Sequence, residues 1–211
     1  ERKISVTGEN IHLKIRDGKS SYLVIFCVDA SGSMGVERRM EMVKGAVFSI
    51  LQDNYINRDK VAMITFRNEG ATLLLPPTRS TEMAHKVLKE IPTGGTTPLA
   101  AGLVKVLDLV REERRKKSGY LPLVILLTDA RGNVWLKDGI EDIEKIGYQF
   151  AKESIPAIII DTESSDVNLG LSKKLAKAAG ARYHHIDHLE NDTLEHLLVQ
   201  EGIMHIPGDY R

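Results

Sequence analysis

The chain has 211 residues, of which 42% are hydrophobic, enough for one large domain with a substantial core. Its 29 basic residues balance 29 acidic ones, so no overall field steers it towards nucleic acid or an acidic membrane surface. Residues 1–211 are predicted to form a single domain, with a core over 21–200 and an N-terminal extension or edge strand over 1–20.

The single cysteine, Cys27, has no partner for an internal disulfide and lies in an apolar run, where we interpret it as a core residue. No apolar stretch approaches the roughly 20 residues that span a bilayer, and the N-terminus lacks the residue order of a signal peptide. We therefore expect a cytoplasmic protein without membrane contact. Because the chain begins with Glu1, we also expect it to be a piece of a longer protein.

Continuous apolar runs rich in Val and Ile predict strands that are buried on both faces. In chain order they cover residues 23–28, 61–66, 123–127 and 157–160, with a weaker run at 183–186. Apolar residues at helical spacing predict helices over 40–51, 83–88, 99–110, 140–151, 171–179 and 194–199. This alternation predicts an α/β, Rossmann-like, doubly wound fold, with a mostly parallel sheet and helices on both faces.

Two segments depart from simple alternation of strand and helix. Residues 11–16 are predicted to form an extra strand, joined by a hairpin at Asp17-Gly18 to the first core strand. Residues 71–75 are predicted to form an antiparallel edge strand that follows strand 61–66.

The charged run over residues 111–117 invites a nucleic-acid interpretation. It also closes the helix predicted to begin near Pro98, where cations complement the negative end of the helix dipole, and Gly119 and Pro122 mark the stop. No set of aromatic residues for base stacking accompanies it. We therefore interpret the run as a solvated helix end and expect no nucleic-acid partner.

The first core strand ends in the sequence Asp29-Ala30-Ser31-Gly32-Ser33. In open α/β sheets, ligands collect at the carboxyl ends of the strands. Residues two positions apart in an extended loop point the same way, so Asp29, Ser31 and Ser33 can converge on one ion. Hydroxyl and carboxylate oxygens are the ligands that Mg²⁺ prefers.

Two further segments supply oxygen ligands at strand or helix ends. Strand 123–127 continues into Thr128-Asp129, and the loop Gly94-Gly95-Thr96-Thr97 leads into a helix. Pro98 fits the first helical position, which would make Thr97 the N-cap with its hydroxyl at the helix mouth. Thr97 is therefore the preferred threonine ligand, and Thr96 is the alternative.

The order of these motifs resembles the metal-ion-dependent adhesion site of von Willebrand factor A-type (VWA) domains. It comprises a strand followed by D-x-S-x-S, a threonine in a Gly-Gly-Thr loop, and a strand ending in Thr-Asp. In that family the first Asp, the two Ser and the loop Thr bind the metal, and the last Asp usually acts through water. The resemblance implies a metal site of Asp29, Ser31, Ser33, Thr97 and Asp129, with Mg²⁺ as the metal and Mn²⁺ as the alternative.

Longer stretches are similar to the VWA domain of the magnesium chelatase D subunit and of related cobaltochelatase subunits. They are VDASGSMG, GGTTPLAAGL, VILLTDARGN and the segment from IIIDTESSD to RYHHID. The resemblance implies a docking module in a complex that inserts a metal into a tetrapyrrole with ATP. Its metal would accept an Asp or Glu carboxylate from a partner, expected to be another chelatase subunit. The chain has no G-x-x-x-x-G-K-[ST] phosphate loop, so we expect the ATPase to lie elsewhere.

Two other classes of function compete with the docking module. Asp29 and Asp129 around Mg²⁺ could support phosphoryl transfer, but no nucleophile or base is evident beside them. A VWA module for adhesion or for scaffolding another complex would use the same metal site. The absence of a disulfide framework counts against an extracellular version of that module.

Several further residues draw attention without joining the predicted site. His184 and His185 are adjacent on a predicted strand and point to opposite faces, so with His188 we interpret them as strand-edge histidines. Asp161 is interpreted as a capping or loop residue. Trp135 is either a contact for a partner or a residue that packs under its own loop.

Overall fold

The computed structural model describes residues 21–32, 36–52, 58–89, 91–129, 140–162, 170–186 and 194–200. Within these ranges, six strands form one sheet in the order β3-β2-β1-β4-β5-β6. The strands are β1 (Tyr22–Asp29), β2 (Lys60–Arg67), β3 (Gly70–Thr78), β4 (Leu121–Thr128), β5 (Ala157–Asp161) and β6 (Arg182–His185). All neighbours pair in parallel except β2 and β3, which are antiparallel, so the predicted edge strand at 71–75 is confirmed.

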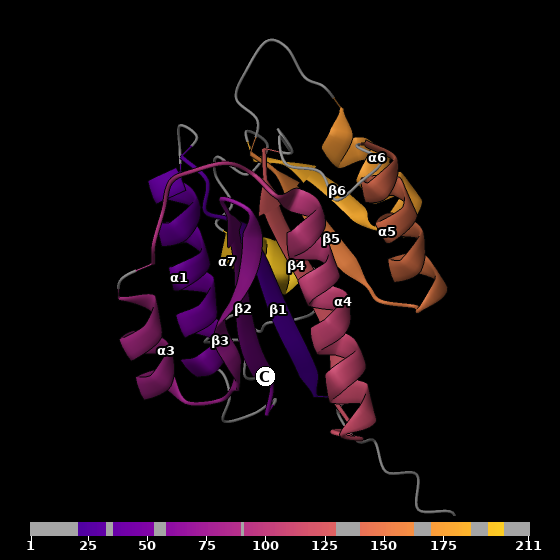
Figure 1. Cartoon of the computed structure of the whole chain (residues 1–211). Helices are drawn as coiled ribbons and strands as arrows, with labels where there is room; N and C mark the ends of the chain where they lie inside the picture. Colours follow the sequence, from indigo (N-terminus) through magenta and orange to yellow (C-terminus); the bar gives the residue numbers. More distant parts are fainter. Residues whose placement is uncertain are drawn as a thin grey trace, which may run out of the picture.

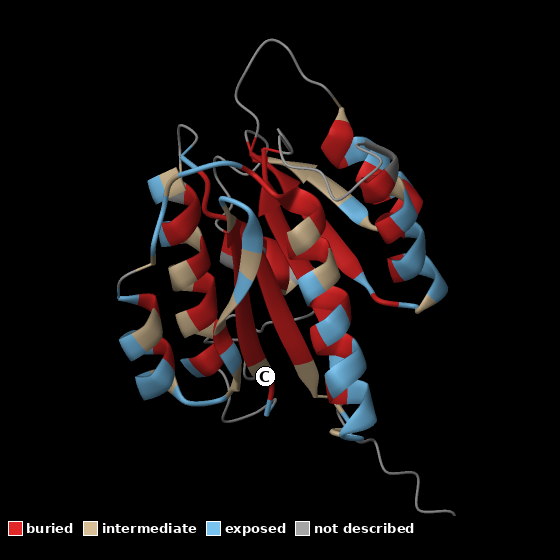
Figure 2. Cartoon of the chain, in the orientation of Figure 1, coloured by how far each residue is buried: buried red, intermediate tan, exposed pale blue. Residues whose placement is uncertain are grey.

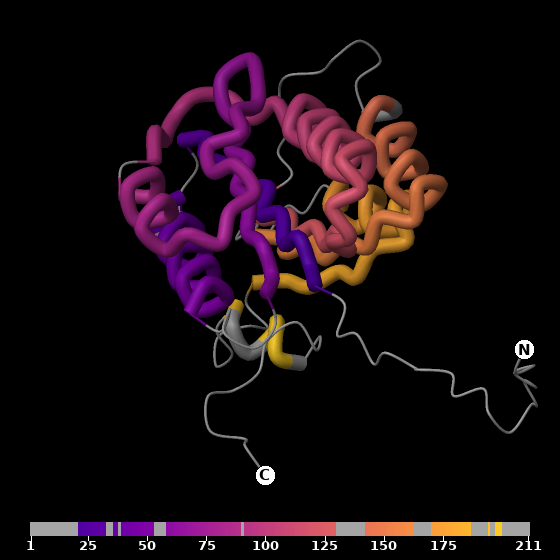
Figure 3. The backbone as a smooth tube through the Cα atoms, turned by 90° about the horizontal axis from the view of Figure 1, so that it is seen from below, coloured from indigo at the N-terminus to yellow at the C-terminus, as the bar shows by residue number. Residues whose placement is uncertain are grey.

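Helices cover both faces of the sheet (Figure 1). They are α1 (Val36–Gln52), α3 (Thr81–Leu88), α4 (Leu99–Arg115), α5 (Ile140–Lys152), α6 (Leu171–Ala179) and α7 (Leu194–Gln200). Figure 3, turned by 90°, shows the helix layers on opposite sides of the strands. The predicted α/β doubly wound fold is confirmed.

Strand β1 shows why the central strands have continuous apolar runs. Leu23, Ile25 and Cys27 pack with α4, α5 and α6 in one core, whereas Val24 and Phe26 pack with α1, α3 and α7 in the other. Because each face of the sheet is covered, successive side chains are all buried, as Figure 2 shows in red.

Cys27 lies in the first of these cores, as predicted, and its side chain is buried. Burial, together with the charge of Asp29, raises the pKa of the Cys27 thiol far above its usual value. The thiol is therefore neutral and acts as a small apolar side chain.

The predicted hairpin between residues 11–16 and the first core strand is wrong. Strand β1 pairs with β2 on one side from Leu23 to Asp29 and with β4 on the other from Tyr22 to Val28. Both edges of β1 are therefore occupied, and a further strand has no free backbone groups to pair with. Residues 11–16 themselves lie outside the described residues.

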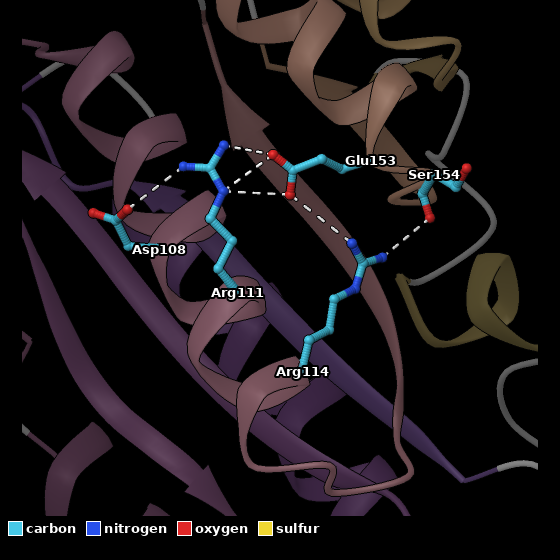
Figure 4. A network of polar contacts seen from close by, with 5 residues as sticks. All are labelled: Asp108, Arg111, Arg114, Glu153 and Ser154. Atoms are coloured by element: carbon cyan, nitrogen blue, oxygen red, sulfur yellow. Dashed lines mark hydrogen bonds and ion pairs between the residues drawn. The ribbon is translucent and has the colours of Figure 1, made fainter.

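The charged run over residues 111–117 ends helix α4, as predicted. Lys116 is the C-cap, and Lys117 takes a positive φ of 51°. Arg111 donates through Nε to Glu153, which follows α5, at 3.0 Å, and Arg114 lies against Ser154 (Figure 4). The run therefore joins α4 to the end of α5 on the protein surface.

Candidate metal site

The predicted site lies at the edge of the sheet formed by the carboxyl-terminal ends of the parallel strands, here called the carboxyl edge. Asp29 is the last residue of β1 and is completely buried. Val28 pairs with Leu127 of β4, so Thr128 and Asp129 lie beside Asp29 and just beyond it. Asp129 is 6% exposed. Two carboxylates from neighbouring strands are therefore held in a buried region.

Two hydrogen bonds fix the carboxylate of Asp29. Its Oδ1 accepts from the backbone N–H of Ser31 at 2.9 Å, and its Oδ2 accepts from the Thr128 hydroxyl at 3.1 Å. Each carboxylate oxygen can accept more than one hydrogen bond, so both retain capacity for a cation.

Burial raises the pKa of Asp29, and the negative charge of Asp129 raises it further. The hydrogen bonds from Ser31 and the positive charge of Arg39 act in the opposite direction without cancelling the rise. The ionised carboxylate is therefore under-compensated in the metal-free protein, and a bound cation would relieve that cost.

The loop over residues 93–97 is held against the Asp29 loop by two backbone hydrogen bonds. Gly94 N–H donates to the carbonyl of Ala30 at 2.8 Å, and Gly32 N–H donates to the carbonyl of Gly95 at 3.2 Å. Gly94 and Gly95 have φ values of 103° and 96°, which side-chain-bearing residues rarely adopt. The two glycines therefore allow the threonine loop to reach the edge of the sheet.

The structure distinguishes the two candidate threonines. Thr96 is exposed, and its hydroxyl donates to the backbone carbonyl of Asn68 in the β2–β3 turn. Thr97 is 5% exposed and lies on the buried side of the loop. These positions favour Thr97 over Thr96 as a ligand.

The predicted start of the following helix is wrong by one residue. Pro98, with φ −84° and ψ 66°, is the N-cap, and its carbonyl accepts from Gly102 N–H at 3.2 Å. Its ψ lies far from the helical value, so α4 begins at Leu99 and no side chain caps it. Thr97 is therefore not the N-cap, although it stays next to the helix mouth.

The structure brings four of the five predicted ligands to this edge of the sheet, namely Asp29, Ser31, Thr97 and Asp129. The fifth, Ser33, lies outside the described residues, as do Trp135 and His188. The donor set of buried carboxylates and hydroxyls suits a hard divalent cation. The residues present fit Mg²⁺.

The other residues singled out in the sequence lie on β5 and β6. Asp161 is the buried last residue of β5 and accepts from the Tyr183 hydroxyl at 2.8 Å, so its side chain joins two strands. His184 and His185 lie on β6, the edge strand, and are partly exposed, as predicted. Burial, and then the charge of Arg182, lower the pKa of His184. Over the described ranges, no three His, Cys, Asp or Glu side chains are grouped to hold a metal.

Sequence reasoning missed Arg39, which is 1% exposed, lies on α1 and interacts electrostatically with Asp29. A signal was present: Arg39 lies four residues before Val43 and eight before Val47, on the apolar side of its helix. It also missed Thr128, whose hydroxyl binds Asp29, because the motif draws attention to the acid that follows.

A six-stranded, mostly parallel sheet with a hydroxyl- and carboxylate-rich edge defines the class of protein. A family model for the von Willebrand factor type A domain matches residues 24–132, and the chain belongs to this family. A solved structure, the SpRpn10 VWA domain, superposes with a TM-score of 0.65 at 14% identity, covering 87% of this chain and 97% of that one. That likeness shows the fold.

Two curated relatives are similar in sequence. The chain is 42% identical over 188 residues to the uncharacterized protein Rv2850c of Mycobacterium tuberculosis, covering 89% of this chain and 30% of that protein. It is 41% identical over 169 residues to the magnesium-chelatase 60 kDa subunit of Rhodobacter capsulatus, covering 77% of this chain and 29% of the subunit. This VWA domain is thus related to magnesium-chelatase subunits and spans under a third of the length of these two relatives.

None of the helices in the described part of the chain is long and apolar enough to cross a membrane.

Proposed function

We propose that this domain is a metal-ion-dependent protein-interaction module of a magnesium chelatase-type or cobaltochelatase-type complex. The observation that carries the proposal is the pair of buried carboxylates, Asp29 and Asp129, at the ends of neighbouring strands that also present Ser31 and Thr97. Burying ionised carboxylates is costly unless something compensates them. A divalent cation does so.

In this proposal Asp29, Ser31, Ser33 and Thr97 hold Mg²⁺ directly, and Asp129 acts through a water molecule. Mg²⁺ commonly uses one or two carboxylates and retains exchangeable waters. The cation then supplies an incompletely neutralised charge to which a partner carboxylate can bind. An Asp or Glu from another subunit is the expected ligand.

The domain itself is proposed to be non-catalytic, with the ATP-dependent insertion of metal into a tetrapyrrole carried out by other parts of the complex. The similarity to chelatase subunits supports this division, because it covers a region that contains no phosphate loop.

The test measures the affinity of the chain for the other subunits of a chelatase-type complex, co-expressed and purified, in Mg²⁺ and in EDTA. We expect tight binding in Mg²⁺, with losses of at least about tenfold in EDTA or on Asp29→Ala, equivalent to about 1.4 kcal/mol. Lys44→Met, which removes a partly exposed cation that pairs with Glu41 on α1, is the matched control and should bind like the wild type. Equal binding by Asp29→Ala in Mg²⁺ would contradict the docking role.

A further inference from the structure

Thr96 is the exposed threonine beside Thr97, and its hydroxyl is engaged by another part of the chain. That hydroxyl donates to the backbone carbonyl of Asn68 in the β2–β3 turn, and the Asn68 N–H donates to the carbonyl of Thr96 at 2.9 Å. The two residues therefore share a reciprocal pair of hydrogen bonds, which joins the threonine loop over residues 93–97 to the turn.

Asn68 contacts the loop with its side chain as well as its backbone. It opens the two-residue turn with a positive φ of 56°, a conformation that asparagine tolerates better than most residues with a side chain. A Cβ added to Gly95 would lie 1.8 Å from Asn68 Oδ1, so the side chain occupies the space beside that glycine. The turn thus contacts two consecutive residues of the loop, Gly95 and Thr96.

The threonine loop is also joined to the segment that follows β1. Two backbone hydrogen bonds connect Gly94 and Gly95 to residues 30–32. Ala30 N–H in turn donates to the carbonyl of Phe66 in β2, at 3.1 Å. The end of β2, the segment after β1 and the threonine loop are therefore linked to one another by hydrogen bonds.

Phe66 also packs against the helix that the loop enters. A Cβ added to Gly102, in the first turn of α4, would lie 2.6 Å from the Phe66 ring. The chain is thus held at Thr96 by the β2–β3 turn and at Gly102 by β2. Thr97, the preferred threonine ligand, lies between these two points and is 5% exposed.

A loop with two consecutive glycines is costly to hold in one conformation. Glycine loses more conformational freedom on folding than any other residue, and Gly94 and Gly95 both have positive φ values. Hydrogen bonds to neighbouring segments offset that loss. If the loop were placed correctly in only a fraction of the molecules, the apparent affinity of the site for a metal would fall by that fraction.

We propose that Thr96 is a positioning residue of the candidate metal site. Its hydroxyl fixes the threonine loop to the β2–β3 turn and so holds Thr97 at the carboxyl edge before a metal binds. The role in the metal-free protein depends on the hydrogen bonds alone, whereas the effect on metal affinity rests on the proposed function. Thr96 acts through the loop and is not itself a ligand.

Amide hydrogen exchange, resolved by NMR on the 211-residue chain in EDTA, tests the role in the metal-free protein. Thr96→Val keeps the branched shape and removes the hydroxyl. We expect the amides of Asn68 and Gly94 to exchange roughly threefold to tenfold faster in this variant, the effect of one net hydrogen bond. Exchange at the wild-type rate would overturn the proposal.

Two variants serve as controls for the exchange measurement. Thr96→Ser retains the hydroxyl and should restore exchange close to the wild-type rate. Thr93→Val makes the same change at an exposed threonine of the same loop, whose hydroxyl bonds to no other described residue, and should exchange like the wild type. Equally fast exchange in Thr93→Val and Thr96→Val would overturn the assignment to the Thr96 hydroxyl.

Calorimetric titration of Mg²⁺ tests the effect on the metal. We expect Thr96→Val to bind roughly threefold to tenfold more weakly than the wild type, and Thr96→Ser and Thr93→Val to bind like it. Unchanged affinity in Thr96→Val would overturn the positioning role, as would weaker binding with wild-type amide exchange, which would make Thr96 a ligand. No binding by the wild type would instead contradict the metal site itself, and exchange in EDTA would still decide whether Thr96 fixes the loop.

Discussion

Charged side chains gather at both ends of the strands, but they differ in burial and in the direction of their pKa shifts. At the carboxyl edge, Asp29, Asp129 and Arg39 are buried, and burial raises the pKa of Asp29. At the other edge, Arg111 and Glu153 join α4 to the end of α5 near the surface (Figure 4), and the hydrogen bond from Arg111 lowers the pKa of Glu153.

The surface ion pair of Arg111 and Glu153 supports the fold, whereas the buried charge of Asp29 costs stability. A surface ion pair is mutually compensated and well solvated, so it contributes a little stability. The buried carboxylate of Asp29 is not fully compensated by the protein, so in its charged form it reduces the stability of the domain. Residues that cost stability and are held in place by several hydrogen bonds mark the candidate functional site.

Altering the backbone that holds the threonine loop should have the largest effect. Gly95→Ala forces a side chain into φ 96° and places its Cβ 1.8 Å from Asn68 Oδ1. We expect a loss of about 1–3 kcal/mol in the free energy of unfolding, measured in urea, and weaker Mg²⁺ binding as Thr97 moves.

Gly94→Ala is the matched control for this prediction. Gly94 has a similar φ of 103°, but an added Cβ would meet no atom within 4 Å. It should lose stability from strain alone and remain closer to the wild type in Mg²⁺ affinity. Equal losses of Mg²⁺ affinity in both variants would show that the contact with Asn68 does not position the loop.

Neutralising the buried carboxylate should give a smaller effect of the opposite sign. Asp29→Asn keeps the shape of the side chain while removing one of two buried carboxylates at the ends of β1 and β4. We expect the variant to gain about 0.5–2 kcal/mol of stability in EDTA and to lose metal binding. Thermal melts with and without Mg²⁺ measure both; a less stable variant in EDTA would mean that the ionised Asp29 stabilises the fold.

Breaking the exposed ion pair should have the smallest effect. Glu153→Gln removes the partner of Arg111 and is expected to cost about 0.5 kcal/mol at neutral pH, less at high salt. The folded-state pKa of Glu153 is lowered, so its contribution is complete above the unfolded pKa and disappears as pH falls through the folded pKa. Urea titrations should therefore converge with the wild type in acid; a difference that persisted there would have another cause.

Most of the fold could be predicted from the sequence because burial on both faces leaves a continuous apolar run. The strands found at 22–29, 60–67, 121–128 and 157–161 extend the predicted ones by at most two residues at an end. Apolar patterning reports which faces of a strand are covered, but not which strands are its neighbours. The hairpin onto β1 was therefore mispredicted, because nothing local shows that β2 and β4 occupy both of its edges.

The positions of Asp29, Ser31, Thr97 and Asp129 near the strand ends could be predicted from motif order, but the contacts that hold Asp29 in place could not. Arg39 reaches Thr162 across 123 positions of sequence, and Thr128 reaches Asp29 across 99. The first contact depends on the packing of α1 against the strand ends, and the second depends on the pairing of β1 with β4. The start of α4 depends on the ψ of Pro98, which proline does not fix.

The most direct test of the metal site is calorimetric titration of Mg²⁺ and Mn²⁺ into the EDTA-stripped 211-residue chain, beside Asp29→Ala. We predict saturable binding near one ion per chain that is lost in Asp29→Ala. Absence of binding in the wild type, or equal binding in the variant, would contradict it.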